Sequence, residues 1–212
     1  NGRHQKQEYS KIGNKLDLIN DELKKTSLQR YRDGGSPTDI WAVRSNGIDP
    51  ATGNELFIKK DGSYTFDYDS NDEVIVGNTE AKLEGVVGSN FYYKGFSFSA
   101  YFRYRLGADY FNSELYNRIE NITSFSEYNQ DKRALYDRWQ NAGDKAKFKG
   151  ISLTESTPIS SRFVQKKNYL TFESIRVAYE FNHEWMQKIR FSGMTVSAYM
   201  SDICRFSTMK DE

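Results

Sequence analysis

A run of alternating apolar and polar side chains at residues 96–106 limits the possible folds more than any other part of this sequence. Successive side chains of a β-strand point to opposite faces, so an unbroken period of two over this length predicts a strand. One face would carry Phe96, Phe98, Ala100, Phe102 and Tyr104, and the other Ser97, Ser99, Tyr101, Arg103 and Arg105. Residues 82–93 are also of strand length and precede this run across Lys94-Gly95, which predicts a tight hairpin.

The same alternation returns at residues 169–181 and 194–200, and we interpret residues 8–13 as the end of a further strand. About five strands are therefore expected, with connections that are alternately long (14–81 and 107–167) and short. Structureless loops beyond about 15 residues are uncommon in compact domains. Outer-membrane β-barrels, in contrast, have short periplasmic turns and long extracellular loops. The predicted fold class is all-β: a fragment of an antiparallel transmembrane β-barrel, with 14–81 and 107–167 as extracellular loops.

The two long segments contain local signals of their own. Apolar residues at helical spacing predict a short amphipathic helix over residues 14–25. Turn-forming residues dominate from residue 32 to residue 53. Asp61-Gly62 lies between two short strand-like segments and is a signal for a two-residue type I′ hairpin turn. A helical turn is expected at residues 131–139.

A soluble β-sandwich, such as a carbohydrate-binding module, is the alternative fold, because its strands also have one apolar and one polar face. The positions of the aromatic residues favour the membrane barrel. They gather next to the two short connections: Tyr92, Tyr93 and Phe96 at one, and Tyr179, Phe181 and Trp185 at the other. An interfacial girdle of aromatic residues would lie at these strand ends in a barrel.

Composition excludes several classes of protein. The 30 basic and 29 acidic residues give a net charge of +1, without the basic excess that displaces counterions from nucleic-acid phosphates. The longest uncharged run, residues 191–201, is too short for a transmembrane helix, which needs about 20 apolar residues. The single cysteine, Cys204, excludes an internal disulfide framework. We therefore expect neither a nucleic-acid binder nor a helical membrane protein.

Several longer motifs extend over nearly all of the 212 residues. They are Gly47-Ile48-Asp49-Pro50-Ala51-Thr52-Gly53 with Glu55-Leu56-Phe57, Val76-Gly77-Asn78-Thr79, Lys82-Leu83-Glu84-Gly85, Tyr93-Lys94-Gly95-Phe96, Phe102-Arg103-Tyr104-Arg105-Leu106-Gly107, Asp131-Lys132-Arg133-Ala134-Leu135-Tyr136-Asp137-Arg138-Trp139, Ser160-Ser161-Arg162-Phe163-Val164 and Asp202-Ile203-Cys204-Arg205-Phe206-Ser207-Thr208. In their content and order, these motifs resemble those of SusC/RagA-type TonB-linked outer-membrane transporters.

The resemblance implies a plugged barrel of about 22 strands that imports nutrients such as oligosaccharides or peptides. It also implies energy supplied through TonB, a SusD-like surface lipoprotein as partner, and the outer membrane of a Gram-negative, Bacteroidetes-like bacterium. The N-terminal plug, the TonB-contacting segment, the early strands and the final strand have no counterpart in these residues. The chain is therefore expected to be the C-terminal portion of a barrel, in contact with the remainder of that barrel and with outer-membrane lipid.

Five strand residues are candidates for contact with an imported ligand, because the polar side of a barrel strand faces the lumen. They are Tyr101, Arg103, Arg105, Arg176 and Glu180. Aromatic rings and guanidinium groups suit sugars or peptides as ligands. A polar lumen alone also explains these residues, so both interpretations stay open.

Neither enzymatic activity nor a cofactor is expected. The sequence has no nucleophile elbow, no Cys–His pairing and no Gly-rich phosphate loop. Asp67-x-Asp69-x-Asn71 copies the start of an EF-hand loop, but Asp72 replaces the required Gly and Asn78 the required acid. A solvated acidic loop without a metal ion is therefore expected there.

Overall fold

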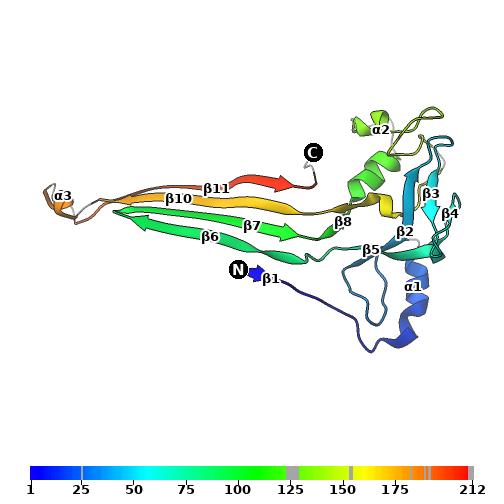
Figure 1. Ribbon diagram of the computed structural model, residues 1–212, viewed down its shortest axis with the longest axis horizontal. Coiled ribbons are helices and arrows are strands. Elements are labelled where there is room, and N and C mark those ends of the chain that lie inside the picture. Colours follow the sequence, from blue (N-terminus) through cyan, green and yellow to red (C-terminus); the bar gives the residue numbers. More distant parts are fainter. Residues whose placement is uncertain are drawn as a thin grey trace. The chain divides into compact units, whose positions relative to one another are not determined.

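The computed structural model describes residues 1–209 except 25, 123–128, 153–154, 182, 189 and 191 (Figure 1). The chain divides into two compact units, each assembled from separate stretches of sequence. Unit 1 comprises Asn1–Gln5, Ala81–Ala108 and Lys166–Glu212, and unit 2 comprises Lys6–Glu80 and Asp109–Gln165. None of the helices in the described ranges is both long enough and apolar enough to cross a membrane.

Unit 1 is one five-stranded antiparallel sheet in the order β1-β6-β7-β10-β11 (Figure 1). Its elements are β1 (Gly2–Arg3), β6 (Leu83–Tyr93), β7 (Phe96–Leu106), β10 (Tyr169–Glu180), α3 (His183–Lys188) and β11 (Thr195–Ser207). The predicted hairpin between β6 and β7 is confirmed. Lys94 and Gly95 both have positive φ angles, 46° and 87°, as a two-residue type I′ turn requires.

The four strands predicted at residues 82–93, 96–106, 169–181 and 194–200 form there, but the prediction at residues 8–13 is wrong. Tyr9 instead lies in a loop, where its N–H donates to the carbonyl of Gly35 and its carbonyl accepts from Gly34. The first strand of the sheet is the two-residue β1. β11 also continues to Ser207, beyond the predicted end at residue 200. The prediction stopped too early because an irregularity in the pairing with β10 interrupts the alternation after Ser201.

Unit 2 is built around a four-stranded sheet in the order β4-β3-β2-β5. Its elements are η1 (Gly13–Leu16), α1 (Asp17–Leu23), β2 (Asp39–Ile48), β3 (Glu55–Ile58), β4 (Tyr64–Thr65), η2 (Ser70–Asp72), β5 (Glu73–Asn78), β8 (Asp109–Phe111), η3 (Leu115–Glu120), α2 (Arg133–Tyr136) and η4 (Ser161–Phe163), and β9 (Val164–Lys166) pairs with β8. The core beside this sheet contains Leu115, Ile119, Ala134, Phe148 and Phe163. The two long predicted loops therefore fold together as one unit.

Three local features of unit 2 differ from the sequence predictions. The many turn-forming residues at 32–53 predicted a loop where the structure has β2. This strand forms because the short apolar run around Ile40, Ala42 and Val43 is buried. The β3–β4 hairpin has Lys59 paired with Ser63 and only Gly62 at a positive φ, 90°. This is a three-residue loop with a type I turn, not a type I′ turn.

The predicted helix is confirmed as η1 and α1, but its buried face is not the apolar one. Ile19 is 43% exposed, whereas Asn20 is only 3% exposed. The Asn20 side chain donates to the carbonyl of Tyr31 and accepts from its N–H, both at 2.8 Å. Hydrogen bonding to a neighbouring loop therefore decides which way this helix faces.

Candidate functional site

The sheet of unit 1 exposes one continuous apolar face. The strand register aligns Phe98 with Phe91 and Val177, and Phe102 with Val87 and Phe172. The exposed members of this face include Val87, Phe91, Phe96, Phe98, Phe102, Leu106, Leu170, Val177, Val196, Met200 and Phe206. Phe96 is 54% exposed and Phe206 67%. A β-sandwich would bury such a face against a second sheet, so this face is not a sandwich core.

All five candidate ligand-contacting residues lie on the opposite, polar face. Tyr101 is cross-strand from Gly88, and its ring lies across that glycine, where an added Cβ would be 2.3 Å from Tyr101 Cδ1. The Tyr101 hydroxyl donates to Asn90 Oδ1 at 3.1 Å. Gly88 therefore provides the space that holds the Tyr101 ring flat against the sheet.

The two arginines of β7 lie beside acidic residues of the neighbouring strands. Arg103 Nη2 donates to Glu173 Oε1 at 2.6 Å, and Glu173 occupies a bulge of β10 between Phe172 and Ser174. Arg105 Nε is 3.9 Å from Glu84 Oε2. Both pairs are partly exposed, so solvent weakens the two ion pairs.

The remaining two candidates lie further along the same face. Arg176 is exposed and aligns with Ser99 and Tyr199. Glu180 is exposed and aligns with Thr195 beside the short connection. With a strand rise of about 3.3 Å per residue, Glu180 is about 35 Å from the row that contains Arg105. The five predicted residues therefore share a face but do not form one site.

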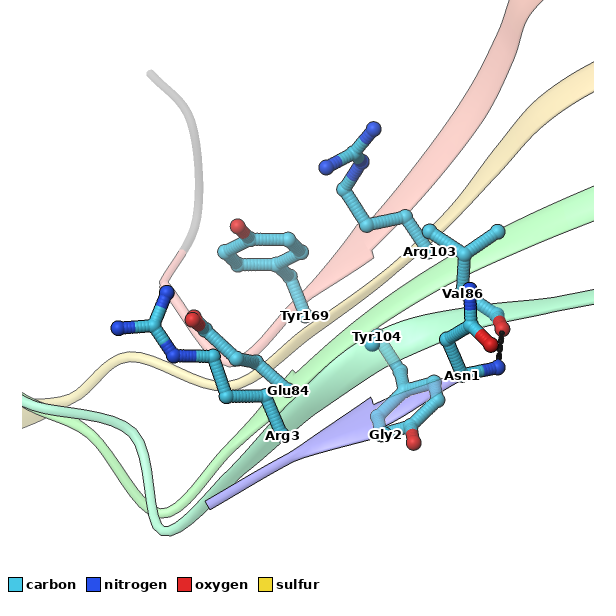
Figure 2. Close-up of a pocket in the computed structure, with 9 residues that line it drawn as sticks. Asn1, Gly2, Arg3, Glu84, Val86, Arg103, Tyr104 and Tyr169 are labelled. Carbon is cyan, nitrogen blue, oxygen red and sulfur yellow. Dashed lines mark hydrogen bonds between the residues drawn. The ribbon is translucent and has the colours of Figure 1, made fainter. Parts of the chain in front are cut away.

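The register adds residues that the sequence alone did not bring to this face. Arg3 lies directly opposite Glu84 on the neighbouring strand, and Arg105 lies directly opposite Tyr169. Figure 2 shows Arg3, Glu84, Arg103 and Tyr169 around a pocket of about 270 Å³, with Tyr104 on the other side of the sheet. Arg205 also joins them, with its guanidinium 4.3 Å from the centre of the Tyr169 ring. Alternation near Arg205 would have been the signal, but the irregularity before Cys204 interrupts it.

Unit 2 contains a separate cluster of buried charges. Arg162 Nη2 donates to Glu55 Oε2 at 3.0 Å and to Glu120 Oε1 at 2.7 Å. Ser160 and Thr157 donate to the same two carboxylates. Burial favours a lower pKa for Arg162, but the two carboxylates outweigh it and raise the pKa. Both carboxylates and the Arg162 Nη groups are hydrogen-bonded within the protein, so this cluster joins distant parts of unit 2.

The acidic segment around Asp69 has a structural role. Asp69 Oδ1 accepts from the N–H of Asn71 at 2.8 Å and so caps η2. Within the described ranges, no group of three His, Cys, Asp or Glu side chains is placed to hold a metal ion. The side chain of Trp185, one of the predicted girdle aromatics, lies outside the described residues.

The two-faced sheet defines a class of protein. Long antiparallel strands with one apolar face exposed and one polar face are the building plan of transmembrane β-barrels. The chain therefore has the fold of part of a transmembrane β-barrel, as predicted.

Comparison with known proteins then narrows the class. The chain is 25% identical over 159 residues to the TonB-dependent receptor P39 of Formosa agariphila, a match that covers 73% of this chain and 15% of the receptor. In structure it matches the RagAB peptide importer in the open-open state with a TM-score of 0.70 and 19% identity, over 87% of this chain and 21% of the importer chain. A RagAB peptide transporter structure gives a TM-score of 0.71 and 18% identity, over 84% and 20% of the two chains. No family model matches the chain.

These similarities confirm the resemblance to SusC/RagA-type TonB-dependent transporters. The chain is similar to part of such a transporter and spans about a fifth or less of the length of the proteins it matches. Those proteins are named as a receptor, an importer and a transporter, which agrees with the prediction that the chain is not an enzyme.

Proposed function

We propose that this chain forms part of the barrel wall of a TonB-dependent nutrient importer in the outer membrane of a Bacteroidetes-like bacterium. The observation that carries the proposal is the sheet of unit 1, whose exposed face is aromatic and aliphatic while its other face holds arginine, glutamate, serine and tyrosine. Lipid covers the first face, and the water-filled lumen meets the second. A soluble carbohydrate-binding module would have no use for an uncovered face of this size.

The proposed mechanism is gated passage rather than chemistry on the cargo. The strands hold polar side chains along the lumen, where they offer hydrogen bonds and charges to a ligand in transit. Energy reaches the barrel through TonB, acting on parts of the protein outside these 212 residues. The cargo is an oligosaccharide or a peptide, and the peptide importers that share this fold support the second choice.

We also propose that unit 2 faces the cell exterior, with residues 14–81 and 107–167 as the extracellular loops. Chain connectivity supports this orientation. Lys94-Gly95 and the short β10–β11 connection join one set of strand ends, whereas both segments of unit 2 join the other set. Short turns are periplasmic in outer-membrane barrels. A SusD-like lipoprotein would then dock on unit 2, where it controls access to the lumen.

Uptake measurements test the importer proposal. The full-length protein, produced with its SusD-like partner in a strain that lacks its own copy, should fractionate with the outer membrane and support uptake of labelled oligomers. Uptake should stop when TonB is depleted, while binding of the oligomers at the cell surface continues. Recovery of the full-length protein in the aqueous fraction without detergent would contradict the proposal.

A further inference from the structure

Two neighbouring rows of cross-strand residues concentrate arginine at one end of the polar face. The first row runs through Arg3, Glu84, Arg105, Tyr169 and Ser207, and the second through Val86, Arg103, Thr171 and Arg205. Side chains directly opposite on neighbouring strands have Cβ atoms about 5 Å apart, and diagonal neighbours about 7 to 8 Å. Arg103 and Arg105 lie on the central strand β7, with Arg3 two strands away on one side and Arg205 two strands away on the other. At about 4.8 Å between strands, each outer arginine is about 10 Å from β7 and about 19 Å from the other outer arginine, so the rows form a band that matches an extended ligand.

The charges of this region do not balance. Glu84 and Glu173 accompany Arg105 and Arg103, which leaves four guanidinium groups against two carboxylates. Among the described residues, neither Arg3 nor Arg205 has an ion pair with a carboxylate, and Asp202, beside the bulge, bonds to none of the four arginines. Within the described part of these two rows and the β10 bulge, four positive and two negative side chains give a formal charge of +2.

The surrounding geometry leaves room for an anion. The pocket of about 270 Å³ is bounded by Arg3, Glu84, Arg103 and Tyr169 (Figure 2). Arg205 lies over the Tyr169 ring, which holds its guanidinium group beside the pocket without neutralising its charge. A guanidinium group presents two parallel N–H donors that match the two oxygens of a carboxylate.

We propose that Arg3, Arg103, Arg105 and Arg205 form an arginine site that binds carboxylates of the imported oligomer, so that the cargo is acidic. The inference rests on the proposed import function and names its ligand class. Two sources supply the same group: the side chains or C-terminus of an acidic peptide, and the uronate units of an acidic oligosaccharide. One carboxylate of the ligand makes bidentate bonds to Arg3 and a second carboxylate of the same oligomer makes them to Arg205, while Arg103 and Arg105 keep their glutamate partners.

A binding experiment on the full-length protein, purified in detergent, tests this site. The probes are a fluorescent glutamate-rich hexapeptide, its glutamine counterpart, a labelled oligogalacturonate and its methyl ester. We expect at least one acidic probe to bind about tenfold more tightly than its neutral counterpart. A single hydrogen bond to a charged group is strong enough to produce a tenfold difference in affinity. The acidic probe that binds identifies the source of the carboxylate.

The variant Arg3→Gln/Arg205→Gln removes the uncompensated charge and leaves both existing ion pairs intact. It should bind the acidic and neutral probes equally and bind the neutral probe as the parent protein does. Arg176→Gln is the matched control on the same face and should keep the preference. Arg205→Lys, which keeps the charge but loses the two-pronged geometry, should show an intermediate preference.

The two proposals fail in different ways. Equal binding of acidic and neutral probes by the parent protein would overturn the carboxylate site alone, as would an unchanged preference in the folded Arg3→Gln/Arg205→Gln variant. Binding of no oligomer of either chemistry, together with absent uptake in cells, would overturn the import function and this site with it.

Discussion

At the scale of single residues, the stability of unit 2 depends on charges buried with their partners. Arg30 is 2% exposed and Glu73 6%, and Arg30 Nη2 donates to Glu73 Oε1 at 2.7 Å while its Nε donates to Oε2 at 3.0 Å. Removal of one partner of a buried pair costs about 3–5 kcal/mol, because the other charge stays buried. Arg30→Leu should therefore lower the free energy of local unfolding by about that amount, measured by hydrogen exchange of β2 and β5 in the full-length protein.

Arg133→Leu is the matched control for this experiment. Its partner Asp131 and the arginine itself are each about 30% exposed as side chains, and pairs in contact with water contribute up to about 1 kcal/mol. An equal loss in the two variants would show that Arg30 acts through packing and not through its charge.

The Arg30→Leu variant should also respond to pH in a defined direction. Burial raises the pKa of Glu73 above its ordinary value, and Arg30 opposes that shift. Without Arg30, the pKa of Glu73 in the folded state rises further above its pKa in the unfolded state. The folded state therefore binds the Glu73 proton more tightly than the unfolded state does. Stability then falls as pH rises from the unfolded-state pKa through the folded-state pKa. Hydrogen exchange at pH 5 and pH 8 should show the larger loss at pH 8, and a larger loss at pH 5 would contradict this reasoning.

At the scale of elements, adjacent positions of β7 should tolerate charge very differently. Phe98 belongs to the exposed apolar face and Ser99 to the polar face. An arginine that faces lipid costs about 2–4 kcal/mol near the bilayer centre. Phe98→Arg should reduce the amount of folded protein in the outer membrane, whereas Ser99→Arg should leave it near the parent level. Heat-modifiable mobility on gels measures the folded fraction, and equal tolerance at both positions would argue against a lipid-facing Phe98.

The strands could be predicted wherever side-chain period alone determines them. β7 has an uninterrupted period of two, and β10 alternates from Ser174 onward, after its bulge, so the face of each of these residues followed from its position. β2 could not be predicted, because it is identified by burial of Ile40 and Val43 within unit 2 rather than by alternation. The arginine site could be predicted only in part. The alternation of β7 places Arg103 and Arg105 on the polar face, but the positions of Arg3 and Arg205 on that face depend on how the strands pair. Contacts such as Ser160 with Glu55 join residues that no local pattern links.

At the scale of the whole molecule, the sheet of unit 1 has two edges that lack most of a neighbour. β11 is the last strand in the sheet order, and within the described residues its outer side pairs with no other strand. On the other side, residues Asn1–Arg3 cover only Glu84, Gly85 and Val86 of the longer β6. Unpaired N–H and C=O groups are especially costly in lipid, where water cannot satisfy them. The sheet should therefore be stable only when further strands of the same barrel complete it.

Expression of residues 1–212 alone should therefore give aggregated or self-associated protein, because each open edge pairs with another copy. Co-expression with the remaining segments of the full-length protein should yield a detergent-soluble complex of defined size, since the proper neighbouring strands then occupy both edges. Size-exclusion chromatography with light scattering distinguishes the two outcomes. A folded, monodisperse 212-residue monomer would mean that the sheet closes its own edges, and it would count against a barrel that needs additional strands.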